Sequence, residues 1–297
     1  MARGPLAVVA AALLAPVAVA AAPSAPGALR VGITAVLFEK HLELNRQFVA
    51  YVGEKLGMPA TLVQRRTYKQ MSDLLERAGL DVAFICGLPY VIDHERFGLE
   101  LLAAPEVYDG PIYFSYVIVP ADSPVQSFEE LRGMRYAFSD PLSNSGWLVP
   151  AHDLARMGTT PEAFFKRTIF TYSHSASVEA VAVKFVDGAS VDSYVYDYLA
   201  RIRPALVART RIVRRSAPHP ITPVVVRAGL PPELKDRLRR TFLEMGEDPR
   251  GRALLTSLGF KRFVPIPDRS FDGIREMRRV VSERSGVAAS AARRSRP

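Results

Sequence analysis

From Leu29 onward, short apolar runs of strand length alternate regularly with stretches of helical periodicity, and this alternation most constrains the fold. Residues 29–33 and 60–64 are apolar runs, and between them residues 41–56 place apolar side chains at helical spacing before Gly57. Strands that alternate with helices in this way are typical of α/β folds with largely parallel sheets. We therefore predict an α/β fold.

The alternating pattern occurs twice along the chain. The two sets are separated by a long predicted strand at residues 111–120, and a strand at residues 222–227 leads back to the first set. We predict two Rossmann-like α/β lobes joined by two hinge strands, with a ligand cleft between them. The boundaries that we expect are 29–116 plus 224–282 for lobe I and 117–223 for lobe II. The second set comprises predicted strands at 135–138, 168–172 and 191–195 and predicted helices at 146–157 and 176–185.

The N-terminus has the pattern of an export signal. Arg3 precedes an apolar run at residues 6–19, and small residues suited to cleavage follow at 18–22. The run is shorter than the roughly 20 residues that a membrane-spanning helix needs, which disfavours an anchor. We therefore expect residues 1–22 to be a signal peptide and the mature protein to be exported.

The formal charge of +9 could indicate nucleic acid, an anionic membrane surface or a small anionic ligand as partner. Much of the excess lies at the C-terminal end, where residues 283–297 are rich in Ala, Ser and Arg. We expect this segment to be a disordered basic tail. Because no basic stripe interleaved with aromatic residues occurs outside the tail, we expect no nucleic-acid partner.

The most informative motif is the polar stretch at residues 139–146, which follows one predicted strand and precedes a helix. Ser143, Asn144 and Ser145 are followed by Gly146, so the backbone N–H groups of a helix start are left accessible. These N–H groups and the helix dipole together favour an anion. An ordinary helix cap is the alternative, but a cap needs one such residue and here three stand in a row.

Two further polar positions follow strands in the second set. His174 lies in the polar turn at residues 173–177, where open α/β sheets bind ligands, and could donate a hydrogen bond or become cationic. Asp192 lies inside a predicted apolar strand, where an acid must be paired. It could accept a hydrogen bond from a protonated ligand oxygen, or it could pair with a nearby arginine.

In the first set, Thr34, Tyr68 and Tyr90 follow successive predicted strands and could supply hydroxyl donors to the same cleft. Ordinary half-buried packing is the alternative for both tyrosines. The sequence contains none of the common catalytic or phosphate-loop motifs, and its five histidines show no metal-ligand spacing. The sole cysteine, Cys86, reads as a small core residue. We therefore expect no enzyme activity, no cofactor and no metal.

The chain resembles the phosphate, phosphite and phosphonate group of ABC-transporter substrate-binding proteins. This resemblance implies a type II periplasmic binding protein fold in which Ser143, Asn144, Ser145 and His174 hold an oxyanion. The motifs that carry it are Gln64-Arg65-Arg66-Thr67-Tyr68, Phe84-Ile85-Cys86-Gly87-Leu88-Pro89-Tyr90, Ser139-Asp140-Pro141-Leu142-Ser143-Asn144-Ser145-Gly146 and Val191-Asp192-Ser193-Tyr194.

By the same resemblance, Tyr68 and Tyr90 would face the ligand from the first lobe, and Asp192 would recognise a protonated oxygen. Tyr194, in the Asp192 motif, completes the expected ligand-binding set. The chain departs from the family after His174, where Ser175-Ala176 stands in place of Asp-Asn.

The function that we expect is that of a monomeric periplasmic solute-binding protein of an ABC importer. Its ligand would be phosphonate, phosphite or phosphate, and its partner would be the permease in the inner membrane. Two alternatives remain open at this point: a ligand-sensing subunit for a membrane sensor kinase, and a pyrimidine-synthase-like enzyme on the same scaffold. The enzyme would require a reactive Cys86 or a His/Asp pair.

Overall fold

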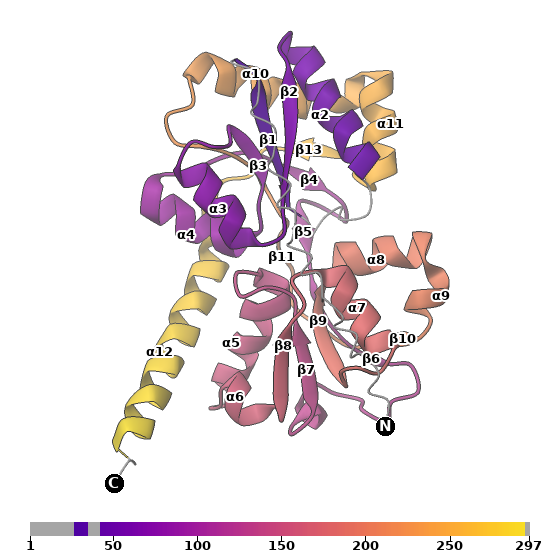
Figure 1. Cartoon of the computed structure of the whole chain (residues 1–297), viewed down its shortest axis with the longest axis vertical. Coiled ribbons are helices and arrows are strands. Elements are labelled where there is room, and N and C mark those ends of the chain that lie inside the picture. Colours follow the sequence, from indigo (N-terminus) through magenta and orange to yellow (C-terminus); the bar gives the residue numbers. More distant parts are fainter. Residues whose placement is uncertain (1–26, 35–41, 295–297) are drawn as a thin grey trace, which may run out of the picture.

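The computed structural model describes residues 27–34 and 42–294, with side chains described up to residue 286. The predicted signal peptide at residues 1–22 lies outside these residues. Figure 1 shows two α/β lobes, one above the other, with the chain crossing between them. The α/β prediction is confirmed.

Lobe I is built on a six-stranded sheet of order β13-β4-β12-β3-β1-β2, in which β3, β1 and β2 are parallel. Its strands are β1 (Leu29–Thr34), β2 (Ala60–Arg65), β3 (Val82–Phe84), β4 (Glu100–Glu106), β12 (Val224–Val226) and β13 (Arg262–Val264). Its helices are α2 (Leu42–Leu56), α3 (Tyr68–Glu76), α4 (Gly87–Phe97), α10 (Pro232–Leu243) and α11 (Pro249–Leu258).

Lobe II is built on a five-stranded sheet of order β10-β6-β9-β7-β8, in which β9, β7 and β8 are parallel. Its strands are β6 (Ser115–Pro120), β7 (Arg135–Phe138), β8 (Arg167–Phe170), β9 (Gly188–Asp192) and β10 (Thr210–Arg215). Its helices are α5 (Val149–Arg156), α6 (Pro161–Phe164), α7 (His174–Ala182), α8 (Ser193–Ile202) and α9 (Pro204–Val207).

The two sheets share one strand order. Lobe I runs β2-β1-β3-β12-β4 and lobe II runs β8-β7-β9-β6-β10, with β13 added at one edge of lobe I. In each lobe the fourth strand, β12 or β6, is antiparallel to the third. That strand is the one which enters directly after the chain has crossed from the other lobe. The two lobes thus have the same architecture, and in each sheet one strand is formed by the chain directly after it crosses from the other lobe.

The crossings form a small sheet of their own, in which β5 (Ile112–Tyr113) pairs with β11 (His219–Pro220). The single long strand predicted at residues 111–120 is therefore wrong, because the run is divided at Phe114 between the hinge and lobe II. Ser115 and Tyr116, expected in lobe I, belong to β6 of lobe II.

The predicted strand at residues 191–195 is also wrong after Asp192. Asp192 ends β9, and its side chain accepts hydrogen bonds from the backbone N–H groups of Tyr194 and Val195, which start α8. Aspartate is a favoured N-cap residue, so the acid ends the strand and starts a helix within the same apolar run.

The disorder predicted for residues 283–297 is wrong as far as Arg294. Helix α12 (Asp272–Arg294) continues through this segment and packs against α4 of lobe I and α5 of lobe II. Figure 1 shows it running from the junction of the lobes along the side of lobe II. Ile274 and Met277, one turn apart, are its buried contacts. Among the described helices, none has both the length and the apolar character that crossing a membrane requires.

Candidate ligand-binding site

The carboxyl ends of the parallel strands in both lobes point toward the junction between the lobes. Thr34 ends β1 beside Arg65, which ends β2, and Cys86 lies just beyond β3. From lobe II, Ser139 follows β7, His174 follows β8 and Asp192 ends β9 at the same junction. Carboxyl ends of parallel strands are where open α/β sheets bind ligands. The polar motifs found in the sequence therefore converge on one place.

The segment after β7 forms the start of a helix, as predicted, and it begins with a π-helical turn, η2 (Asn144–Leu148). Ser143 caps this turn, because its side-chain oxygen accepts a hydrogen bond from the N–H of Gly146 at 3.0 Å. Gly146 lies against Ser139: a Cβ added at position 146 would stand 1.6 Å from Ser139 Oγ. The loop is therefore closely packed around its helix start.

The middle residue of the motif, Asn144, contacts the other lobe and the hinge. Its backbone N–H donates to Cys86 Sγ at 3.3 Å, and its side-chain Nδ2 donates to the hydroxyl of Tyr113 at 3.0 Å. Cys86 precedes α4 of lobe I, and Tyr113 lies in hinge strand β5. Asn144 thus joins residues 139–146, which we call the ligand loop, to lobe I and to the hinge. Its place in the motif did not indicate this role.

Several polar atoms at this junction are buried and have no hydrogen-bond partner within the described structure. A buried polar group without a partner is costly, so each such atom needs a ligand or water. The atoms are Thr34 Oγ1, Tyr68 OH, Ser139 Oγ, Asn144 Oδ1 and Ser145 Oγ. Because they come from both lobes, a ligand that satisfied them would be enclosed between the lobes.

His174, the first residue of α7, is a neutral donor in this site. The backbone N–H of Asp192 donates to its Nδ1 at 3.0 Å, so Nδ1 carries no proton and Nε2 carries one. Nε2 lies 3.5 Å from Ser143 Oγ. Burial lowers the pKa of His174 to about 3. The expectation that His174 could become cationic is therefore corrected, because the imidazolium would be desolvated.

We expect His174 to stay neutral, with the proton on Nε2, across the range between about pH 5 and 8 in which free histidine titrates. Nitrogen-15 chemical shifts of the ring, measured by NMR in labelled protein, distinguish the two neutral tautomers and the cation. His174→Gln identifies the resonance. A His174 signal that titrates within this range, or one with Nδ1 protonated, would contradict the assignment.

Asp192, whose backbone N–H contacts the His174 ring, is itself buried. Its Oδ1 accepts from the N–H groups of Tyr194 and Val195 at 2.8 and 3.4 Å. Burial raises the pKa of its carboxyl to about 7, although these two N–H groups act in the other direction. A carboxyl with such a pKa can carry or accept a proton near neutrality.

Two tyrosines expected in the ligand-binding set have their hydroxyls elsewhere. Tyr90 OH donates to Asp268 at 2.6 Å, and its ring packs against Phe271, so the side chain joins α4 to the C-terminal segment. Tyr194 OH donates to the backbone carbonyl of Leu258 at 2.5 Å, which links α8 of lobe II to α11 of lobe I. The structure does not bring either hydroxyl to the junction cluster.

The interpretation of Cys86 as a small core residue is confirmed, since it is 2% exposed and belongs to the main hydrophobic core, while its Sγ also contacts the cluster. Sequence reasoning missed three other members of the cluster. Tyr113 lies in the hinge and gave no signal at all. Ser139 and Asp140 belong to the recognised motif but were not singled out, although Asp140 is 4% exposed and contacts lobe I through the N–H of Tyr68.

Two lobes of one strand order, two hinge crossings and an enclosed polar cluster at the strand ends define a type II periplasmic binding protein. The chain belongs to the family of periplasmic substrate-binding proteins of phosphonate ABC transporters, whose sequence model matches residues 11–271. The members of this family bind substrates for transport, which confirms the expectation of a binding protein and not an enzyme.

Individual relatives agree with this family. The phosphonates-binding periplasmic protein of Escherichia coli is 27% identical over 256 residues, which cover 84% of this chain and 75% of the relative. A binding protein component of a Pseudomonas aeruginosa ABC phosphonate transporter has a TM-score of 0.81 at 23% identity, covering 87% of this chain and 88% of that chain. PhnD1 of Prochlorococcus marinus, solved with methylphosphonate, has a TM-score of 0.80 at 18% identity, covering 87% and 99%. These two structural likenesses establish the fold.

Proposed function

We propose that this chain is the periplasmic receptor of an ABC importer and that it binds a phosphonate, or a related phosphorus oxyanion, between its lobes. The observation that carries the proposal is the set of buried polar atoms without partners in the described structure, which come from strand ends and helix starts of both lobes. An oxyanion with several acceptor oxygens would satisfy the hydroxyl donors among them together. Export by the predicted signal peptide and delivery of the ligand to a membrane permease complete the role.

Each group has a defined task in this proposal. Ser143, Ser145 and the N–H groups of the helix start would hold the phosphorus oxygens, since a helix N-terminus favours an anion. His174 would donate from Nε2, and Thr34 and Tyr68 would donate from lobe I. Two carboxyls, Asp140 and Asp192, belong to the described cluster, and the donors that it offers are hydroxyls, backbone N–H groups and the neutral ring of His174.

Asp192 would discriminate between oxyanions by protonation state. Its buried carboxyl, with a pKa of about 7, would share one proton with a ligand oxygen. A phosphorus oxyanion that carries a proton near neutral pH can donate it to the ionised carboxyl, whereas sulfate carries none and avoids contact between two anions only while Asp192 keeps its own proton. We therefore expect phosphonate, phosphite or phosphate to bind more tightly than sulfate.

A ligand screen tests the proposal. Purified mature protein would be melted with phosphate, phosphite, methylphosphonate, 2-aminoethylphosphonate, sulfate and taurine. A ligand at a hundred times its Kd raises the free energy of unfolding by roughly 2.7 kcal/mol, which a melting curve detects. We expect a shift with at least one phosphorus oxyanion and none with sulfate or taurine.

Variants connect the shift to the site. Ser143→Ala with Ser145→Ala should remove the shift, whereas Ser257→Ala, whose exposed hydroxyl bonds within α11, should keep it. The absence of a shift with every oxyanion, or an undiminished shift in the double variant, would overturn the proposal.

A further inference from the structure

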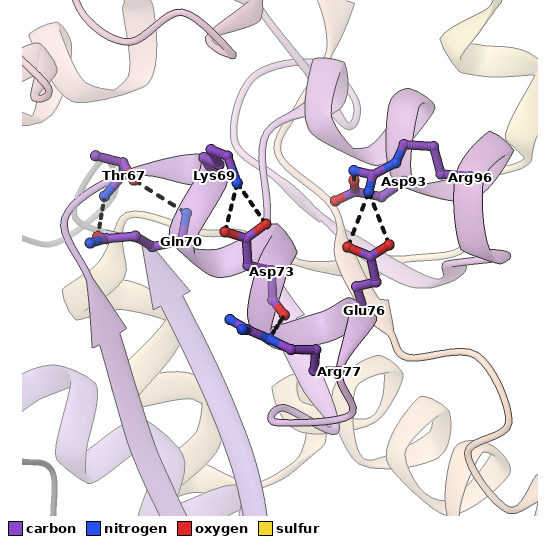
Figure 2. A network of polar contacts seen from close by, with 8 residues as sticks. All are labelled: Thr67, Lys69, Gln70, Asp73, Glu76, Arg77, Asp93 and Arg96. Atoms are coloured by element: carbon purple, nitrogen blue, oxygen red, sulfur yellow. Dashed lines mark hydrogen bonds and ion pairs between the residues drawn. The ribbon is translucent and has the colours of Figure 1, made fainter.

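Helix α3 of lobe I has a well-ordered first turn that lacks an acid of its own. Thr67 Oγ1 accepts from the N–H of Gln70 at 3.2 Å, and Gln70 Oε1 accepts from the N–H of Thr67 at 3.3 Å, as Figure 2 shows. On the exposed side of the helix, Lys69 pairs with Asp73 at 2.8 Å. This capping box gives the N–H of Gln70 a hydrogen-bond acceptor. It gives none to the N–H of Tyr68, the first residue of the helix.

The acid at this helix start comes from the other lobe. The N–H of Tyr68 donates to Asp140 Oδ2 at 3.4 Å, and the two residues are 72 positions apart. Asp140 lies after β7 of lobe II and is 4% exposed. A carboxylate at a helix N-terminus is stabilised by the helix dipole, and more so where it is partly buried. The contact therefore favours the arrangement in which the lobes are together.

The same carboxyl also shapes the ligand loop. Asp140 Oδ1 accepts from the N–H of Leu142 at 2.8 Å, and its backbone carbonyl accepts from the N–H of Ser143 at 2.9 Å. Ser143 then caps the π-helical turn that carries the proposed oxyanion donors. One oxygen of Asp140 is thus used within the loop and the other reaches lobe I, so the loop and the lobe contact share one side chain.

We propose that Asp140 is a positioning residue that couples the ligand loop of lobe II to closure on lobe I, by capping α3 across the junction. The proposal rests on the proposed function, because it assigns a role within that ligand site. Since the cap contacts the protein and not the ligand, it stabilises the closed state equally for every ligand. Apparent affinity scales with the fraction of competent molecules, so losing the cap should weaken all ligands by one common factor.

The test compares Asp140→Asn with Asp73→Asn, a matched change of an acid on the exposed side of α3. Titration calorimetry with methylphosphonate, phosphite and phosphate gives Kd, and stopped-flow measurement gives the rate of dissociation. We expect Asp140→Asn to weaken each bound ligand about tenfold, as for loss of one hydrogen bond to a charged group, chiefly through faster dissociation. Asp73→Asn should change Kd by less than about twofold.

Small-angle X-ray scattering provides a readout that ligand chemistry does not affect. Without ligand, the radius of gyration of Asp140→Asn should exceed that of the wild type, because fewer molecules are closed. If Asp140→Asn fails to fold, Asp140→Ser replaces it, since a serine side chain can still accept within the turn but is too short to reach Tyr68.

The outcomes separate the two proposals. A wild type that binds no phosphorus oxyanion overturns the proposed function, and the scattering comparison still tests the cap. A wild type that binds, with Asp140→Asn unchanged in Kd and in radius of gyration, overturns the cap alone. A change in selectivity among the ligands would also overturn it, because it would place Asp140 on the ligand.

Discussion

Gly146→Ala is expected to weaken ligand binding by roughly 5- to 150-fold. A Cβ at position 146 would stand 1.6 Å from Ser139 Oγ, 2.9 Å from Ser139 Cβ and 3.0 Å from His174 Cε1. Ser139 is fully buried, so rotating its hydroxyl away cannot relieve all three contacts. The helix start must move away from Ser139 and His174, and this displaces the proposed oxyanion donors that the helix start carries.

The size of this effect follows from overpacking, which costs about 1–3 kcal/mol in a well-packed interior. If that strain acts on the liganded state, affinity falls by roughly 5- to 150-fold. Calorimetric titration with methylphosphonate measures it. Gly273→Ala is the matched control, because the same Cβ on α12 would meet nothing within 4 Å. Wild-type affinity in Gly146→Ala would show that the loop adapts and that the site lies elsewhere.

The second large effect concerns Asp192→Asn, which should gain stability relative to the wild type as the pH rises. Below about pH 4, Asp192 is protonated in both the folded and the unfolded wild type. Between about pH 4 and pH 7 the unfolded chain releases this proton while the folded chain keeps it, so the wild type loses stability. Above about pH 7 both states are ionised and no further stability is lost.

The variant lacks this loss, because asparagine does not ionise and still caps α8. The difference in free energy of unfolding between the ligand-free variant and the wild type should therefore rise by on the order of 4 kcal/mol over this range. Urea unfolding at a series of pH values measures the difference. His174 and His219, whose pKa values burial lowers to about 3 and about 4, titrate in both proteins and cancel. A difference that does not depend on pH would contradict the raised pKa of Asp192.

Sequence reasoning succeeded where the signal is local and periodic. The strand predicted at residues 135–138 agrees with β7, and the helical spacing at residues 41–56 agrees with α2, because an apolar run and Gly57 mark their bounds. It failed at residues 191–195, where the same apolar side chains suit a strand and a buried helix. There the carboxyl of Asp192 selects the helix, because it accepts hydrogen bonds from the first N–H groups of α8 in the folded chain.

The candidate site likewise contains some residues that the local sequence pattern predicts and others that only the fold places. Ser143, Ser145 and His174 follow strands and start helices, so a sequence pattern predicts that they gather at one sheet edge. Tyr90 was expected there for the same reason, yet Asp268 holds its hydroxyl from a position 178 residues away. No local pattern contains such a partner.

The sequence by itself determined the α/β alternation, the doubling into two sets and the polar helix starts after the strands. These features depend on residue type and on spacing within a few residues. Only the tertiary structure decided that His174 donates from Nε2, that Asp192 holds its proton to about pH 7, and that Asp140 caps a helix of the other lobe. Those properties depend on desolvation and on hydrogen bonds between segments far apart in the chain, which exist only after the two lobes have come together.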